Sequence, residues 1–555
     1  MALSQTNYCG MVIWLAFKDI CLARPLSVLT TCIFVLILAT LYLLRACRQT
    51  QRTTRIRGPQ GTSLIFGLAK TVVDSNITNE LYEPWAKEYG PVYKIPHALG
   101  KYRLMLWDQK AISHFYARDT SLYHHTPFNK IILPIAIGRG VMGADGESHR
   151  RQRKNINPTF NAAAVRSLSS IFQDVAHKAV IAWDAEIESN RGDDCAVIDV
   201  QQWMNHISLD NAGIGILSHD FGALDGNGSD VEHVLNAFSA SVDPSNSLFI
   251  LGQTFPSIMK LPWPRTKFSQ KLHLTVGQIC QEMLSRRRKE KETGGTDERD
   301  KSCLGLLLKA EESGETVGLT QREVLDEARI LLLGAFETTA VSLTWAFIEL
   351  GRNPDIQTKL RDECLEFGST PSYDDLTNKL PYLNAVVNEV LRLHSPVVEV
   401  PRAVTEDDVI PLSEPLYTAD GKFTDNIYIA KGTEVVIPLA ALNRSVSMWG
   451  PDAKVFKPSR WFKEDEGTHG TGDMPHGYRH LMTFGNGARM CPGRLFALTQ
   501  FKTVLFILVR HFMFEMADGA EVQIVKSLGL LPRPSVVGST EAGCSVPLRV
   551  RRYEV

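Results

Sequence analysis

The chain has 555 residues, of which 44% are hydrophobic and 22% are charged, and this composition excludes wholesale disorder. Its net charge of −1 argues against a nucleic-acid-binding protein that relies on bulk positive charge. The 10 cysteines are too sparse for a disulfide scaffold, so we expect a large intracellular protein with a substantial core.

The first expected element is a transmembrane anchor over residues 26–44, which carry no charge. At about 1.5 Å of rise per residue, this helix spans the roughly 30 Å hydrocarbon core of a bilayer. A run of arginines follows it, so the positive-inside rule predicts a lumenal segment over residues 1–25 and a cytosolic chain after the anchor. A cleaved signal peptide is the alternative, but the apolar run is long for one and a stop-transfer pattern follows it. A shorter apolar run, residues 11–17, lies at the interface or simply precedes the anchor.

Residues 45–60 form a basic stretch that ends in a stiff hinge at Gly58-Pro59. Residues 61–555 contain no repeat and are predicted to form one cytosolic catalytic domain. The charged run over residues 286–301 mixes both signs and contains paired glycines, which favours a solvated loop between helices.

Helical periodicity dominates this domain. Residues 324–350 are apolar on nearly all sides, which predicts a helix buried through the middle of the domain. A second helix is predicted over residues 381–393, with Pro396 ending it. Strand-like runs are short and lie near residues 91–106, residues 425–438 and the last forty residues. The expected fold class is therefore mainly α with small β-sheets.

The most informative segment is residues 484–493, which read Phe-Gly-Asn-Gly-Ala-Arg-Met-Cys-Pro-Gly. A cysteine is most often a small buried hydrophobe. Here three glycines surround Cys491, and an apolar helical run follows it. Glycines let the backbone turn tightly and direct amide donors at the sulfur, and the start of a helix adds to them. This pattern predicts a loop that holds an anionic sulfur ligand.

Residues 484–493 resemble the haem-binding loop of the cytochromes P450, Phe-x-x-Gly-x-Arg-x-Cys-x-Gly, and match it at every fixed position. The resemblance implies the cytochrome P450 fold, an α+β arrangement in which haem b lies between a long central helix and the cysteine loop. It also implies that Cys491 is the proximal iron ligand, whose thiolate favours O–O cleavage. Phe484 and Arg489 are implied to contact the haem.

Glu389 and Arg392 form a Glu-x-x-Arg pattern, and this spacing places both charges on one helix face. Alone, this pattern is uninformative, because surface helices contain many such pairs. Arg460 lies in a run, residues 456–461, that resembles a second arginine motif of the family. The resemblance implies that Glu389, Arg392 and Arg460 form a buried network that fixes the loop under the haem. Removing one member would cost on the order of 3–5 kcal/mol.

Residues 334–339, Gly-Ala-Phe-Glu-Thr-Thr, place an acid and two hydroxyls inside the apolar helix, where polar groups need a reason. One interpretation is structural: the threonine bonds to the carbonyl four residues earlier and the acid lies at a kink. The resemblance implies instead that the helix crosses the distal haem face, with Gly334 and Ala335 leaving room for dioxygen. Thr338 would then hold the activated oxygen and its water, and Glu337 would relay protons from solvent. The family more often has glycine at Ala335, whose methyl narrows the pocket.

The haem propionates call for cationic partners. His149 and Arg153 match the position where the family commonly has Trp-x-x-x-Arg, with His149 replacing the tryptophan. Arg402 and Arg489 match two further propionate partners. Neighbouring cations are expected on a solvated face, or on one that contacts an acidic redox partner: Arg150, Arg151 and Lys154.

The resemblance implies a haem-thiolate monooxygenase on the endoplasmic reticulum membrane, anchored by a single pass, that inserts one atom of dioxygen into an apolar substrate. Electrons would come from NADPH through a separate NADPH-cytochrome reductase, with or without cytochrome b5. A separate protein is expected because no Gly-x-Gly-x-x-Gly motif opens a βαβ unit in this chain. One alternative is a haem-thiolate isomerase or dehydratase that rearranges a peroxide, but such relatives tend to lose the acid-alcohol pair that Glu337 and Thr338 provide. A haem-binding sensor or electron carrier is a third class.

The predicted substrate pocket is mostly apolar, with Glu399 as a polar steering contact, and its expected lining is residues 128–134, 239–262, 397–400 and 528–531 together with the helix near Phe336. An apolar pocket beside a membrane suits a terpenoid, steroid-like or fatty substrate. The chain resembles fungal family members of specialised-metabolite pathways, which favours a terpenoid; fatty acids and xenobiotics are alternatives.

Overall fold

The structure of the chain is a computed structural model. The structure describes residues 52–74, 78–190, 194–226, 231, 233–236, 247–260, 264–293, 303–312, 318–462, 480–527, 531–537 and 544–553, together with residues 30, 33, 37 and 40. The predicted anchor over residues 26–44 therefore lies almost wholly outside the described residues. Within them, the helix that is long and apolar enough to cross a membrane is α15 (Gln321–Arg352). Because 78% of its apolar window is buried inside the protein, α15 is a core helix.

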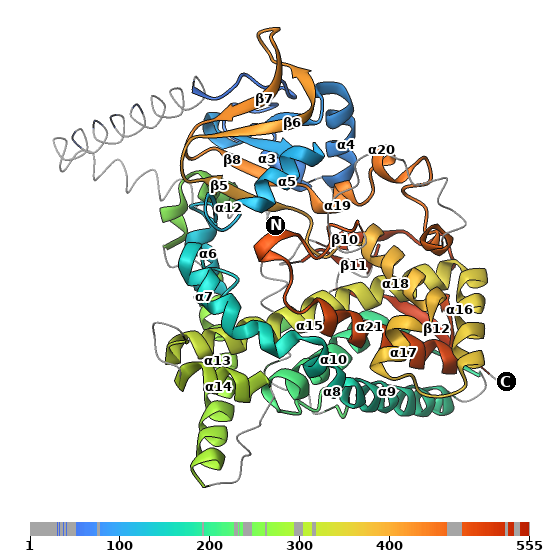
Figure 1. Ribbon diagram of the computed structural model, residues 1–555. Coiled ribbons are helices and arrows are strands. Elements are labelled where there is room, and N and C mark those ends of the chain that lie inside the picture. Colours follow the sequence, from blue (N-terminus) through green and yellow to red (C-terminus); the bar gives the residue numbers. More distant parts are fainter. Residues whose placement is uncertain are drawn as a thin grey trace, which may run out of the picture.

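Helix α15 is the axis of the helical part of the molecule, and it confirms the buried helix predicted over residues 324–350. It begins at a capping box in which the Thr320 hydroxyl accepts from the Glu323 amide and the Glu323 carboxylate accepts from the Thr320 amide. It contacts α10 (Val200–Ala212), α13 (Pro264–Glu292), α18 (Pro381–Leu393) and α21 (Arg494–His511). Figure 1 shows α15 running through the centre of the molecule beside α21.

The remaining helices enclose this axis or lie against the sheets. Their bounds are α3 (Ala69–Asp74), α4 (Thr78–Tyr89), α5 (Gln109–Ala117), α6 (Asn129–Ala136), α7 (Gly146–Ile156), α8 (Ala162–Ser167), α9 (Ser169–Ser189), α12 (Ser247–Thr254), α14 (Cys303–Glu312), α16 (Pro354–Phe367), α17 (Tyr373–Asn378), α19 (Leu439–Leu442) and α20 (Val446–Trp449). The predicted helix over residues 381–393 is confirmed as α18. Its buried residues share one large core cluster with α9, α10, α15 and α21.

A separate layer of sheet covers one end of the helical part (Figure 1). The main sheet has the strand order β1-β2-β8-β5-β3 and its strands are β1 (Val92–Pro96), β2 (Tyr102–Leu106), β3 (Tyr123–His124), β5 (Val400–Val404) and β8 (Glu434–Ile437). A hairpin of β6 (Asp408–Tyr417) and β7 (Phe423–Ile429) forms a separate two-stranded sheet, and residues of both sheets and of α5 share a second core cluster.

Two smaller sheets come from the C-terminal region. Strand β12 (Pro547–Arg552) pairs with both β4 (Cys195–Asp199) and β9 (Phe512–Met516). Strands β10 (Ile524–Ser527) and β11 (Arg533–Val536) form an antiparallel pair. The predicted fold class, mainly α with small sheets, is confirmed within the described residues.

The loop predicted over residues 286–301 is wrong at its N-terminal end, because α13 continues to Glu292. Arginine, lysine and glutamate are good helix formers, and charges of opposite sign meet one turn apart along this end of the helix. Glu290 pairs with Arg286 at 3.2 Å and with Arg287 at 3.0 Å. The alternating charges therefore extend the helix into solvent. Residues 294–301 lie outside the described residues.

Candidate active site

The Cys491 loop lies between Leu481 and the start of α21. The Cys491 amide donates to the Phe484 carbonyl at 2.9 Å, which closes the loop. Gly485 and Gly487 both have φ of +67°, a conformation that favours glycine. Gly487 also lies against Tyr116, because a Cβ atom there would be 2.7 Å from the Tyr116 carbonyl oxygen. The turn therefore needs glycine at residue 487 for both conformation and space.

The Cys491 thiol combines burial with groups that favour its anion. Burial raises its pKa, while a hydrogen bond from the Gly493 amide and the charges of Arg153 and Arg494 lower it. A bound metal deprotonates a coordinating thiol outright. By contrast, Cys280 and Cys303 lie in helices, and burial raises the pKa of each thiol to about 12. Among the described cysteines, Cys491 is thus the one built into a loop suited to a thiolate.

A cluster of buried cations lies near this loop. Arg489 donates to the Asp145 carboxylate at 2.8 Å and to the Ala144 carbonyl at 2.9 Å. The His125 ring lies between the two arginines, with one nitrogen 3.4 Å from Arg402 Nη1 and the other 3.4 Å from Arg489 Nη1. Burial, followed by the Arg402 charge, lowers the pKa of His125 to about 3. The positive charges of Arg402 and Arg489 therefore lie close enough together to disfavour a further positive charge on His125.

His149 and Arg153 complete the cluster from α7. Burial, with Arg489 and Arg153 next in effect, lowers the pKa of His149 to about 4. Burial also lowers the pKa of Arg402 to about 10. His149 Nδ1 and Arg402 Nε are buried and have no hydrogen-bond partner in the described part of the chain. A buried polar atom without a hydrogen-bond partner costs free energy, and the carboxylates of a haem would supply partners for the Arg402 guanidinium and for His149 in the tautomer or charge state that donates. The donor set therefore fits haem, with Cys491 able to bind its iron.

The Glu389 carboxylate is the centre of a fully buried network. Arg392 donates to both of its oxygens at 2.8 and 2.9 Å, and Arg460 donates to Oε1 at 2.9 Å. The exposed fraction of all three side chains is 0%. The Trp461 indole and the Lys457 amide add donors at 3.0 Å each. Arg392 also binds the carbonyls of residues that precede η5 (Pro458–Trp461), so the network ties α18 to this segment.

The polar residues of α15 occupy two different environments. Gly334 is exposed although the helix around it is buried, and a Cβ atom there would meet nothing within 4 Å. Thr338 donates its hydroxyl to the Gly334 carbonyl at 2.7 Å, which is the structural bond considered for it. Its oxygen still has lone pairs with which to accept a hydrogen bond. Glu337 is 1% exposed, and its Oε1 lies 3.3 Å from Arg533 Nη2. The Phe336 side chain packs in the core.

The expected steering role of Glu399 is wrong. Its carboxylate accepts from Arg103 at 2.6 Å and from the Tyr82 hydroxyl at 3.0 Å. Arg103 also binds Glu434 at 2.7 Å, so these charges satisfy one another between the main sheet and α4. A carboxylate paired in this way holds the sheet in register.

The prediction that Arg151 lies on a solvated face is also wrong. Its guanidinium binds Glu323 through two hydrogen bonds, at 2.5 and 3.0 Å, and joins α7 to the start of α15. Arg150 remains exposed beside Glu147, and Lys154 is exposed as well. The difference arises because Arg151 lies one residue further round the helix, on the side that packs against the protein.

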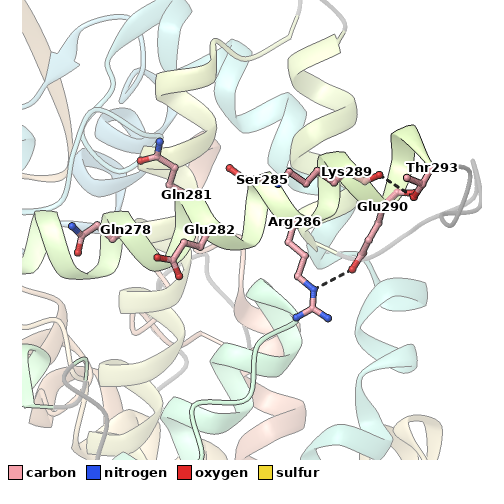
Figure 2. A pocket seen from close by; sticks show the side chains of 8 residues that line it. All are labelled: Gln278, Gln281, Glu282, Ser285, Arg286, Lys289, Glu290 and Thr293. Carbon is pink, nitrogen blue, oxygen red and sulfur yellow. Dashed lines mark hydrogen bonds and ion pairs between the residues drawn. The ribbon is translucent and has the colours of Figure 1, made fainter.

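A hollow of about 730 Å³ lies elsewhere, along the outer side of α13. Figure 2 shows that its side chains project from a single helix, with Arg286 paired to Glu290. The lining comes from one exposed helix end and contains none of the residues predicted for the site. The chemistry of the molecule is therefore centred on the Cys491 loop.

Several residues of the site carried no sequence signal. His125 and Asp145 belong to the cationic cluster, and Asp119 lies beside Arg489, where burial raises its pKa to about 6. Trp461 and Arg533 contact the two glutamates. Each joins the site through contacts between residues far apart in the chain, which no local spacing could have revealed.

A cysteine loop with a thiolate-favouring amide, next to a cluster in which His149 Nδ1 and Arg402 Nε have no hydrogen-bond partner within the described residues, is typical of a haem-thiolate protein. The Cytochrome P450 family profile matches residues 57–537 of the chain, and the chain belongs to that family. It is 48% identical over 512 residues to cytochrome P450 monooxygenase claQ of Ampulloclitocybe clavipes, covering 91% of this chain and 94% of the relative. It is 45% identical over 522 residues to claW of the same organism, covering 93% and 96%.

A more distant relative is cytochrome P450 monooxygenase 205 of Postia placenta, at 30% identity over 517 residues, with 91% of this chain and 94% of the relative covered. The chain is accordingly an enzyme of the monooxygenase class whose cofactor is haem with a cysteine thiolate ligand. The predicted family, enzyme class and cofactor are thereby confirmed.

Proposed function

We propose that Cys491 is the iron ligand and that Arg402, Arg489, His149 and Arg153 hold the haem, with Phe484 against its thiolate side. The observation that carries this assignment is a pair of buried nitrogens without hydrogen-bond partners in the described residues, His149 Nδ1 and Arg402 Nε. They lie in the same cluster as Arg153, whose charge acts on the Cys491 thiol. The network of Glu389, Arg392 and Arg460 would hold the segments that support the loop.

Bound haem supplies the activation of dioxygen, with one oxygen atom going to the substrate and the other to water. The remaining steps belong to the chain. Gly334 and Ala335 leave space on α15, and Thr338 Oγ1 accepts a hydrogen bond while it donates to the Gly334 carbonyl. Glu337 holds a proton at its carboxylate and passes it toward Thr338. Burial of Glu337 excludes bulk water from this position, so protons would reach Thr338 through the Glu337 carboxylate and not directly from solvent.

The proposed substrate is an apolar small molecule, with a terpenoid favoured over a fatty acid or a xenobiotic. Support comes from two expected lining segments that lie together, since the Phe128 and Phe249 rings meet edge to face at 5.0 Å. Parts of the expected lining, residues 239–246, 261–262 and 528–530, lie outside the described residues. The electron donor would be a NADPH-cytochrome reductase, with or without cytochrome b5, and residues 26–44 would anchor the enzyme in the endoplasmic reticulum membrane.

The test uses membranes that contain the full chain and an NADPH-dependent reductase, supplied with labelled dioxygen and a panel of terpenoids and fatty acids. One labelled oxygen in a terpenoid product, lost in Cys491→Ala, would support the proposal. A labelled fatty acid with no terpenoid product would overturn the substrate class. Conversion of an added peroxide to an unlabelled isomer without NADPH would favour the isomerase or dehydratase. A thiolate-type carbon monoxide spectrum retained in Cys491→Ala would overturn the ligand assignment.

A further inference from the structure

Asp119 is an acid that is buried among the cations assigned to the haem. It lies two residues beyond α5, and its backbone carbonyl accepts from Arg489 Nε at 3.3 Å. Helix α5 also contacts η7 (Gly487–Arg489), the short helix that precedes Cys491. Asp119 is 2% exposed, and the charges of Arg489 and Arg402 act on its carboxyl group. An acid therefore lies beside the arginines that are proposed to bind the haem carboxylates.

Two acids flank Arg489, and their hydrogen bonds differ. Asp145 accepts from the Arg489 guanidinium at 2.8 Å and from the His125 amide at 3.1 Å, and its pKa is lowered because these interactions outweigh burial. Both carboxylate oxygens of Asp119, by contrast, are buried and have no hydrogen-bond partner within the described residues. Burial raises the pKa of Asp119 to about 6, although the Arg489 charge, the Arg402 charge and the Arg489 backbone amide act to lower it. Asp145 thus compensates the charge of Arg489, whereas burial favours a proton on Asp119.

A buried carboxyl group without partners is unfavourable in either charge state. The anion lacks donors, and the protonated acid is a donor that lacks an acceptor. The hydroxyl of Tyr116, on which the Asp119 charge acts, is also buried without a hydrogen-bond partner in the described part of the chain. A haem carboxylate held by Arg402 and Arg489 would place negative charge near Asp119 and raise its pKa further. Haem binding therefore favours the protonated acid and also supplies an acceptor for its proton.

We propose that Asp119 holds a proton in the haem-loaded enzyme and donates it in a hydrogen bond to a haem carboxylate. The proposal rests on the assignment of Arg402 and Arg489 to the haem carboxylates that is given above. Asp119 acts as a positioning residue, since it adds an uncharged donor where a further negative charge would be costly.

The groups around Asp119 leave it as the one that titrates near neutral pH. The charged and titratable groups that act on it are Arg489 of η7, Arg402 of β5 and Tyr116 of α5. Arginine stays protonated in proteins, and burial raises the pKa of Tyr116. Asp119 is therefore the member of this group that changes charge between about pH 6 and about pH 8.

The proposal fixes the direction of a pH effect. Asp119 has a pKa of about 6 without haem, and haem raises it, so haem binding takes up a proton above about pH 6. The contribution of Asp119 to haem retention is then complete below about pH 6. It falls by up to about tenfold per pH unit above that value, until the pH reaches the pKa of Asp119 in the haem-loaded state.

The test measures the rate at which the haem-loaded full chain in membranes releases haem to a haem-free acceptor protein, at about pH 6 and about pH 8. Asp119→Asn carries an amide that donates at both pH values, so its release should stay slow at the higher pH. The ratio of the rate at the higher pH to that at the lower pH should therefore be about tenfold larger in the wild type than in Asp119→Asn. Groups that titrate in both proteins affect both ratios and cancel in the comparison: Cys491, His125 and His149.

Two further variants separate this role from a structural one. Asp145→Asn is the matched control, because Asp145 also flanks Arg489 but has a lowered pKa and stays ionised. It should speed haem release by the same factor at both pH values. Asp119→Val keeps the size of the side chain without a donor. It should release haem faster than the wild type at both pH values, with a pH ratio as small as that of Asp119→Asn.

A second measurement covers the case in which the Asp119 variants do not retain haem. The infrared difference spectrum between haem-loaded and haem-free wild type at about pH 7 should show the carbonyl band of a protonated carboxylic acid in the loaded state. Haem labelled with carbon-13 at its carboxylates should leave this band in place, because the protein carries the proton.

The outcomes are distinguishable. A wild-type pH ratio in Asp119→Asn, while Arg402→Leu releases haem faster, would overturn the role of Asp119 and leave the arginine assignment intact. Wild-type release in Arg402→Leu at both pH values would overturn that assignment and the proposal with it. An infrared band that is absent, or that moves with the labelled haem, would also overturn the role of Asp119. The expected result is a pH ratio that falls in Asp119→Asn and an infrared band that the label leaves unchanged.

Discussion

The Glu389 network makes a prediction whose size can be worked from its bonds. Oε1 accepts from Arg392, Arg460 and the Lys457 amide, and Oε2 accepts from Arg392 and the Trp461 indole. Glu389→Gln keeps the shape of the side chain but replaces one carboxylate oxygen with an amide NH₂ group. At least two of these hydrogen-bond donors would then point at another donor. Two hydrogen bonds to a charged group are worth roughly 1.5–3 kcal/mol each. The loss is therefore about 3–6 kcal/mol, which overlaps the roughly 3–5 kcal/mol cost of breaking a buried ion pair.

The assay compares unfolding midpoints in urea, followed by tryptophan fluorescence, for the haem-loaded wild type and its variants. Trp461→Phe removes one neutral donor and should cost about 1 kcal/mol. Glu147→Gln removes an exposed partner of Arg150 and should cost at most about 1 kcal/mol. An unchanged slope of free energy against urea would show that the variants unfold to the same extent. If Glu389→Gln were no less stable than Glu147→Gln, the network would contribute nothing and the reasoning would be refuted.

Three other expectations follow from the geometry. Gly487→Ala should lower haem content, because its φ of +67° and the Tyr116 carbonyl oxygen at 2.7 Å both oppose a Cβ atom. Gly334→Ala should load haem normally, because a Cβ atom there meets nothing within 4 Å, and should lose turnover, because the methyl group occupies the space proposed for dioxygen. Arg402→Leu and His149→Leu should each release haem roughly tenfold to a hundredfold more readily to a haem-free acceptor protein, since each removes a charge-assisted bond; equal retention would argue against the assigned cradle. Burial raises the pKa of Glu327 to about 8 from its ordinary 4.5, so the folded state keeps a proton that the unfolded chain releases. Stability is then full below about pH 4.5 and falls up to about pH 8, and Glu327→Gln should flatten that fall in unfolding midpoints measured across this range.

The parts of the site that could be predicted from sequence are those whose chemistry is local. The glycines around Cys491, the spacing of Glu389 and Arg392, and the polar break in a long apolar helix are all set within one turn of loop or helix. The partners of these residues are not local. His125, the residue after β3, contacts the arginines, and Arg533 contacts Glu337 from β11. Such contacts depend on how the sheets pack on the helices, and composition leaves no trace of them.

Glu399 shows the same limit in the opposite direction. A carboxylate in an apolar stretch suggests contact with a ligand, because an unpaired charge there is costly. The cost is in fact met by Arg103 of β2 and Tyr82 of α4, which lie nearly three hundred residues or more before it in the chain. A lone polar residue in an apolar segment therefore indicates that a partner exists, without indicating whether that partner is a substrate or the protein.

The two buried glutamates of the core illustrate how this fold separates support from chemistry. Both Glu389 and Glu337 are almost fully removed from water and both face arginine, so burial and charge alone do not distinguish them. Their difference lies in the segments that they join. Arg392 and Arg460 bind Glu389 at 2.8–2.9 Å and tie α18 to η5, whereas Arg533 Nη2 lies 3.3 Å from Glu337 Oε1 and links β11 to α15. Glu389 therefore joins segments of the framework, whereas Glu337 lies on the helix that carries Thr338, beside the space left at Gly334.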